Sequence, residues 1–136
     1  MIRQIMRDPI FLAQRSEPAN GEDVSVAADL LDTLLANRSI CVGLAANMIG
    51  VRKRIIAFFN GPVPMLMLNP VITEKQGAYQ TEEGCLSLIG VRKTARWQKI
   101  TVSWQDLKLR KQTGTFTGYT AQIIQHEIDH CDGILI

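Results

Sequence analysis

A chain of 136 residues with 46% hydrophobic and 21% charged residues has the composition of an ordinary globular protein, and its apolar stretches are too short to cross a membrane. Its length suits one domain, which we expect to span residues 1–136. The formal net charge is only +2, and no stripe of aromatic residues accompanies the basic clusters, so no specific nucleic-acid surface is expected. The charged start has no apolar signal segment behind it, and the three cysteines lack disulfide spacing; both features favour the cytoplasm.

The first fifty residues predict an arm, a helix and a small-residue loop. Pro9 and Pro18 favour an extended arm laid over the surface up to Ala19. Over residues 20–37, leucines and alanines recur at intervals of three and four, which predicts a helix buried along one side. Residues 41–50 are rich in Gly and Ala, so their backbone can approach a helix or a ligand closely.

Four later segments predict β-strands. Residues 54–60, 65–73 and 99–104 are apolar or β-branched runs separated by Gly, Pro and Asn, and residues 114–118 are a further short candidate. Apolar and polar residues alternate over 99–104, which is typical of a half-buried strand in an antiparallel sheet.

The last predicted helix carries the pattern His-Glu-x-x-His. We expect Thr120 to cap it and Gly133 to end it. Residues four apart share a helix face, so His126 and His130, the only two histidines, present their imidazoles to one point, with Glu127 beside them. The alternative is an exposed helix with scattered polar residues. Because apolar residues occupy the opposite face, we predict an α+β fold in which antiparallel β-sheets surround this central helix.

A catalytic metal site would need a third protein ligand besides the two histidines. Only cysteines and carboxylates are left, and residues 82–87 offer both in a Gly-containing turn. Cys85 is the natural candidate, although a lone cysteine is by default a buried structural residue. One thiolate and two imidazoles would leave a fourth position open for water, as in catalytic sites.

At this point the sequence resembles the peptide deformylases from about residue 29 to the end. Three ordered motifs carry the resemblance. Residues 43–50 (Gly-Leu-Ala-Ala-Asn-Met-Ile-Gly) are similar to the first motif, residues 83–87 (Glu-Gly-Cys-Leu-Ser) match the second, and residues 125–130 (Gln-His-Glu-Ile-Asp-His) match the third. The resemblance implies a deformylase-like fold and an enzyme of protein biosynthesis that performs N-terminal processing.

The implied activity is metal-dependent hydrolysis of the formyl amide from the N-terminal formyl-methionine of newly made polypeptides. Nascent chains at the ribosome are the implied partners. By the same resemblance Cys85, His126 and His130 hold one divalent ion, with Fe(II) expected in the cell and Zn, Ni or Co also accepted. Glu127 is the implied acid and base, and the backbone N–H of Leu86 holds the developing oxyanion.

Further residues are candidates for substrate binding and for support of the site. The backbone at Gly43 could pair with an extended peptide, and Val42 and Ile123 are small apolar candidates for a methionine pocket. On the family pattern, Glu83 and Arg92 look like support for the metal site; an exposed ion pair is the alternative.

The chain also departs from the family pattern. Met48 stands where the family carries a Gln whose amide donates to the oxyanion, and a thioether has no N–H. Cys41 replaces a Gly, and Ile89 stands where a Pro often follows the second motif. If no other group supplies the donor, turnover should be low, and Met48→Gln should raise kcat by at least about tenfold.

Three functions remain in view. The first is a working deformylase. The second, motivated by Met48, is a deformylase-like paralogue with weak or altered amidase activity. The third is a non-catalytic metal-binding protein, which is disfavoured because a structural site needs neither Glu127 nor an open position.

Overall fold

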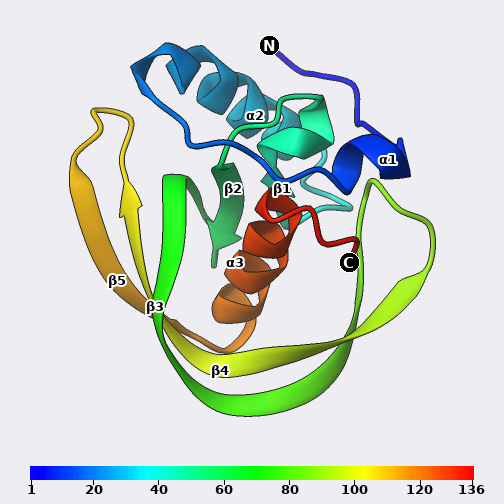
Figure 1. Ribbon diagram of the computed structural model, residues 1–136, viewed down its shortest axis with the longest axis vertical. Coiled ribbons are helices and arrows are strands. Elements are labelled where there is room, and N and C mark those ends of the chain that lie inside the picture. Colours follow the sequence, from blue (N-terminus) through cyan, green and yellow to red (C-terminus); the bar gives the residue numbers. More distant parts are fainter.

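The computed structural model describes residues 1–136 as a sheet wrapped around one C-terminal helix (Figure 1). In chain order the elements are α1 (Pro9–Leu12), the 3-10 helix η1 (Gly21–Asp23), α2 (Val24–Ala36), β1 (Gly43–Ala45), the 3-10 helix η2 (Ala46–Ile49), β2 (Ile55–Asn60), β3 (Val63–Gly84), β4 (Val91–Gln105), β5 (Lys111–Thr117) and α3 (Gly118–Cys131). The predicted α+β class and the central helix are confirmed. No helix is both long and apolar enough to cross a membrane.

One antiparallel sheet replaces the several sheets that were expected. Its five strands follow the order β1-β2-β3-β4-β5. β3 has 22 residues, and its register with β4 shifts between Leu68 and Val71 and again between Ile72 and Glu74. Such bulges bend a strand, and β3 and β4 curve together beneath α3 in Figure 1. A single bent sheet can therefore enclose the helix.

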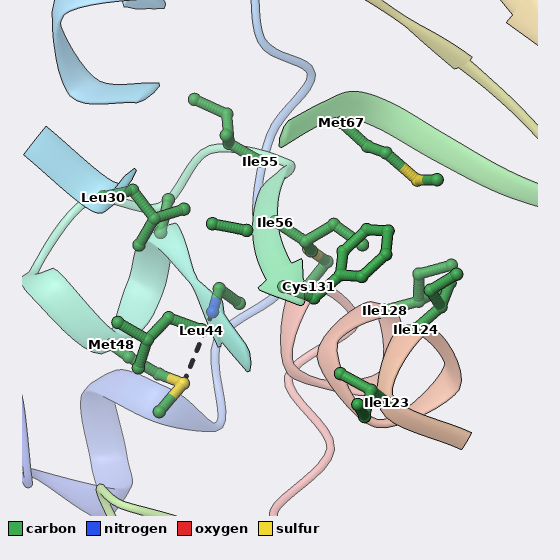
Figure 2. Packing of buried hydrophobic residues seen from close by; sticks show 14 of the residues in the cluster. Leu30, Leu44, Met48, Ile55, Ile56, Met67, Ile123, Ile124, Ile128 and Cys131 are labelled. Atoms are coloured by element: carbon green, nitrogen blue, oxygen red, sulfur yellow. Dashed lines mark hydrogen bonds between the residues drawn. The ribbon is translucent and has the colours of Figure 1, made fainter. Parts of the chain in front are cut away.

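The core lies between the inner face of this sheet and α3. Its cluster of 25 buried residues joins Ile56 and Phe58 of β2 to Ile124 and Ile128 of α3. Figure 2 shows Ile56 of β2 on the side of the sheet that faces Ile124 and Ile128 of α3, with Met67 of β3 above them. Because α3 packs on the sheet behind its histidines, the buried apolar cluster holds the backbone of the proposed site in place.

The predicted arm and helix termini are partly right. Residues 1–8 have no regular structure, but Pro9 begins the short helix α1, since Pro is favoured in a first helical turn and the Asp8 carboxylate accepts from the Ile10 N–H at 3.0 Å. The helix predicted over 20–37 is confirmed as η1 and α2. Thr120 does not cap α3: Thr117 is the N-cap residue, and Thr120 lies within the helix. Gly133 follows the helix end, as expected, with φ +75°.

Candidate active site

Three side chains from two parts of the chain converge at the centre of the molecule. Cys85 follows β3 directly, and α3 carries His126 and His130 on its inner face. The Cys85 Sγ lies 3.3 Å from His130 Nε2, which lies 3.2 Å from His126 Nε2. All three possible ligand atoms fall within 4.8 Å of one another. One thiol and two imidazole nitrogens so placed match the donor set of a divalent transition metal, and a tetrahedral ion would keep one open position.

A buried carboxylate orients His126 from behind. Glu83, near the end of β3, lies 2.8 Å from His126 Nδ1 and accepts from Arg96 at 2.7 Å and from Gln122 at 2.8 Å. Burial opposes ionisation of Glu83, but hydrogen bonds from His126, Arg96 and Gln122 outweigh it and lower its pKa to about 2. The Glu83 carboxylate can only accept, so Nδ1 carries a proton, and Nε2 is the nitrogen that faces the site and binds an ion once its own proton is lost.

The arginine expected beside Glu83 was the wrong one. Arg92 faces Glu83 in the β3–β4 register, yet Arg96 makes the ion pair and also donates to Asp129 of α3 at 2.8 Å. Alternation places Arg92 and Arg96 on the same face of β4, so the strand pattern alone cannot choose between them. Arg96 pairs with Glu83 because it also reaches Asp129, and only the packing of α3 on β4 brings this second carboxylate close.

The two imidazoles differ in charge because they lie too close together to be protonated at once. Burial lowers the pKa of His126, but its contacts with Cys85 and Glu83 raise it further, to about 10. Burial and the charge of His126 lower the pKa of His130 to about 3. His130 is therefore neutral and offers a free lone pair across the physiological range.

Glu127 lies beside this group with an unsatisfied oxygen. It is 3% exposed, and its Oε1 has no hydrogen-bond partner. Burial raises the pKa of Glu127 to about 7, which suits a group that both takes and returns a proton near neutral pH. A Cβ at Gly43 would lie only 2.8 Å from Glu127 Oε2, so glycine is required where β1 passes the carboxylate.

The candidate residues for substrate binding line one cavity of about 590 Å³, together with Cys85, His126 and Glu127. Val42, Gly43, Leu86 and Ile123 all border it. Sequence reasoning missed four further lining residues, which are Arg7, Ile40, Tyr119 and Gln122. Arg7 had no signal, because it lies in a segment without periodicity.

Met48 also borders the cavity but faces the core with its sulfur. Its side chain is 1% exposed, and Sδ lies 3.4 Å from the Ala45 N–H, the contact dashed in Figure 2. Met48 belongs to the same buried apolar cluster as Leu30 and Leu44. Met48 therefore offers no hydrogen-bond donor to the cavity.

An antiparallel sheet around a helix with two histidines, a nearby cysteine and a buried glutamate defines a metal-dependent hydrolase. Residues 2–136 match the family model described as polypeptide deformylase. A peptide deformylase of Clostridium beijerinckii is 54% identical over 136 residues and is covered, like this chain, over its full length. The chain therefore belongs to the peptide deformylase family, the hydrolases that remove the formyl group from N-terminal formyl-methionine.

Solved structures agree with this assignment. The peptide deformylase from Thermotoga maritima superimposes with a TM-score of 0.88 at 28% identity, over 99% of this chain and 95% of that chain. A class I type b peptide deformylase from Acinetobacter baumannii, solved with Met-Ala-Ser bound, gives a TM-score of 0.89 at 26% identity, over 99% of this chain and 97% of that chain. The bent sheet and its helix are thus the family fold.

Proposed function

We propose that Cys85, His126 and His130 hold the divalent ion of this deformylase, and that Glu127 transfers the protons of the reaction. The observation that carries the proposal is the convergence of three ligand-type atoms beside a buried carboxylate oxygen that has no partner. When bound, the ion supplies Lewis-acid chemistry, which acidifies water and polarises a carbonyl group.

The residues of the chain perform the remaining steps. Glu127 accepts a proton as a water molecule adds to the formyl carbon, and the Leu86 N–H holds the oxygen on which negative charge develops. The bond between the formyl carbon and the methionine nitrogen then breaks. Glu127 returns the proton to the departing amine, so that formate and a free N-terminus are released.

The cavity suits an extended peptide that begins with methionine. β1 pairs with β2 on one side only, so its other edge, at Gly43, can bind a peptide backbone. Ile123 and Val42 give the cavity apolar walls for the methionine side chain. The Acinetobacter baumannii relative was solved with the tripeptide Met-Ala-Ser, which supports a ligand of this class.

We further propose that the chain acts as a single domain of residues 1–136 in the cytoplasm, on N-formyl-methionyl nascent chains at the ribosome. Neither nucleic acid nor a membrane is a proposed partner. Fe(II) is the proposed ion in the cell, and the Cys-His-His set also suits Zn, Ni or Co.

Formate release from formyl-Met-Ala-Ser by anaerobically prepared protein, reloaded with each ion in turn, tests this function. The proposal expects turnover in the metal-loaded protein and its loss after chelation. Slow turnover in fully loaded protein would favour the weak paralogue, for which the burial of Met48 is the motivating observation. Full metal binding without formate release would favour the non-catalytic reading.

A further inference from the structure

The N-terminal arm reaches the cavity and contacts two of its walls. The Met6 N–H donates to the Met48 carbonyl at 2.7 Å, which fixes the arm beside η2. The next residue, Arg7, lines the cavity, and its Nη1 donates to the Leu86 carbonyl at 2.8 Å. The arm thus holds Arg7 between Met48 and the loop that carries Leu86.

Arg7 has hydrogen-bond donors to spare. A guanidinium carries five N–H donors in one plane and stays charged at every working pH. One N–H is used by the Leu86 carbonyl, and the Arg7 side chain forms no other hydrogen bond and no ion pair within the protein. The bond to Leu86 fixes the orientation of the plane, while the other donors remain free for a ligand.

No lysine and no second arginine borders the cavity. Arg7 is the only arginine or lysine among its lining residues, whereas Glu82, Glu83 and Glu127 all carry carboxyl groups there. Met48 shares the wall with Arg7, but its sulfur is turned to the Ala45 N–H and donates nothing. Arg7 is therefore the one arginine or lysine that a developing negative charge in the cavity can meet.

We propose that Arg7 donates from its free N–H groups to the formyl oxygen of the bound substrate. This inference rests on the proposed function, in which the Leu86 N–H holds the same oxygen. Charge gathers on that oxygen as water adds to the formyl carbon, so a prearranged cationic donor stabilises the transition state more than the ground state. Arg7 would then replace the side-chain donor that Met48 cannot provide.

The test compares four variants of the metal-loaded protein on formyl-Met-Ala-Ser. Arg7→Met keeps the length of the side chain without any donor, and Arg15→Met removes an exposed arginine elsewhere on the arm as the matched control. Arg7→Met should lower kcat by about tenfold to a hundredfold, with KM changed by less than about threefold. Arg15→Met should match the unchanged protein.

The other two variants carry Met48→Gln, alone and combined with Arg7→Met. If one donor can replace the other, Met48→Gln should raise kcat more in the Arg7→Met background than in the unchanged protein, which is the coupling that a double-mutant cycle measures. Thermal unfolding and metal content of each variant show that the fold and the site are intact.

The outcomes separate the two proposals. Unchanged protein that releases no formate would overturn the proposed function and the role of Arg7 with it. An active protein in which Arg7→Met equals Arg15→Met would overturn the role of Arg7 alone. The role of Arg7 would also be overturned if Arg7→Met changed only KM, or if Met48→Gln changed kcat equally with and without Arg7→Met.

Discussion

Gln125, the first residue of the third family motif, offers a sharp test of how α3 is held on the sheet. Its Oε1 accepts from the Trp97 N–H at 2.8 Å, and its Nε2 donates to the Trp97 carbonyl at 2.9 Å. β5 pairs with β4 only as far as Lys99, so the outer edge of β4 has no strand beside it at Trp97. The Gln125 amide takes the place of that strand.

Gln125→Leu removes both partners of the Trp97 backbone without changing the side-chain length greatly. Each buried backbone group left unpaired costs about 1–3 kcal/mol, and leucine recovers about 1 kcal/mol through apolar burial. We therefore expect the unfolding free energy to fall by about 1–5 kcal/mol, which corresponds to roughly 3–15 °C in Tm for a domain of this size.

Urea unfolding of the metal-free protein measures this loss without the contribution of a bound ion. Gln80→Leu is the matched control, because Gln80 is exposed on β3 and makes no side-chain hydrogen bond. Equal midpoints for the two variants would refute the reasoning and leave Gln125 without a role as a clamp.

Four further outcomes are expected. Cys85→Ala should lose most of the bound metal, whereas Cys41→Ala should keep it, as measured by elemental analysis after gel filtration. Glu127→Ala should retain the ion but lower kcat by roughly a hundredfold to ten-thousandfold; full turnover would place the base elsewhere. Burial raises the pKa of Cys41 to about 12, so a thiol reagent at pH 8 should label it only when the protein unfolds. The hydrogen bond from the Arg110 backbone N–H is the main contact that lowers the pKa of Asp106. The ionised Asp106 carboxylate therefore stabilises the fold above about pH 4, and this contribution is lost in more acidic solution. Asp106→Asn should weaken the fold more at pH 7 than at pH 3 in urea unfolding.

The features that sequence reasoning placed correctly depend on local geometry. His126 and His130 share a helix face at any position of that helix, so their convergence needed no tertiary information. Cys85 required only the chemistry of metal ligands and the absence of other histidines. The helix of residues 20–37 had a clear apolar period, and the structure confirms it.

The features that sequence reasoning missed depend on contacts between distant segments. The second half of β3 is mostly exposed and polar, so the strand predicted over 65–73 was too short. Arg96 and Arg92 occupy equivalent positions on one strand face, and only Asp129 of α3 distinguishes them. Arg7 reaches the cavity through a hydrogen bond to a residue 79 positions away, for which the sequence of the arm has no periodic signal.

The burial of Met48 changes what its replacement can be expected to do. From the sequence, Met48→Gln should restore a missing donor and raise kcat by at least about tenfold. In the structure, a glutamine at this position would find its amide in the buried apolar cluster beside the Ala45 N–H, where the amide oxygen can accept but the NH₂ group must find a new partner. To donate into the cavity, the side chain must turn away from that N–H, toward the wall that Arg7 already occupies. Met48→Gln can therefore give its full gain in kcat only when no other donor occupies that wall. The gain in kcat from Met48→Gln in the unchanged protein, compared with the gain in Arg7→Met, measures how much of the oxyanion contact Arg7 supplies.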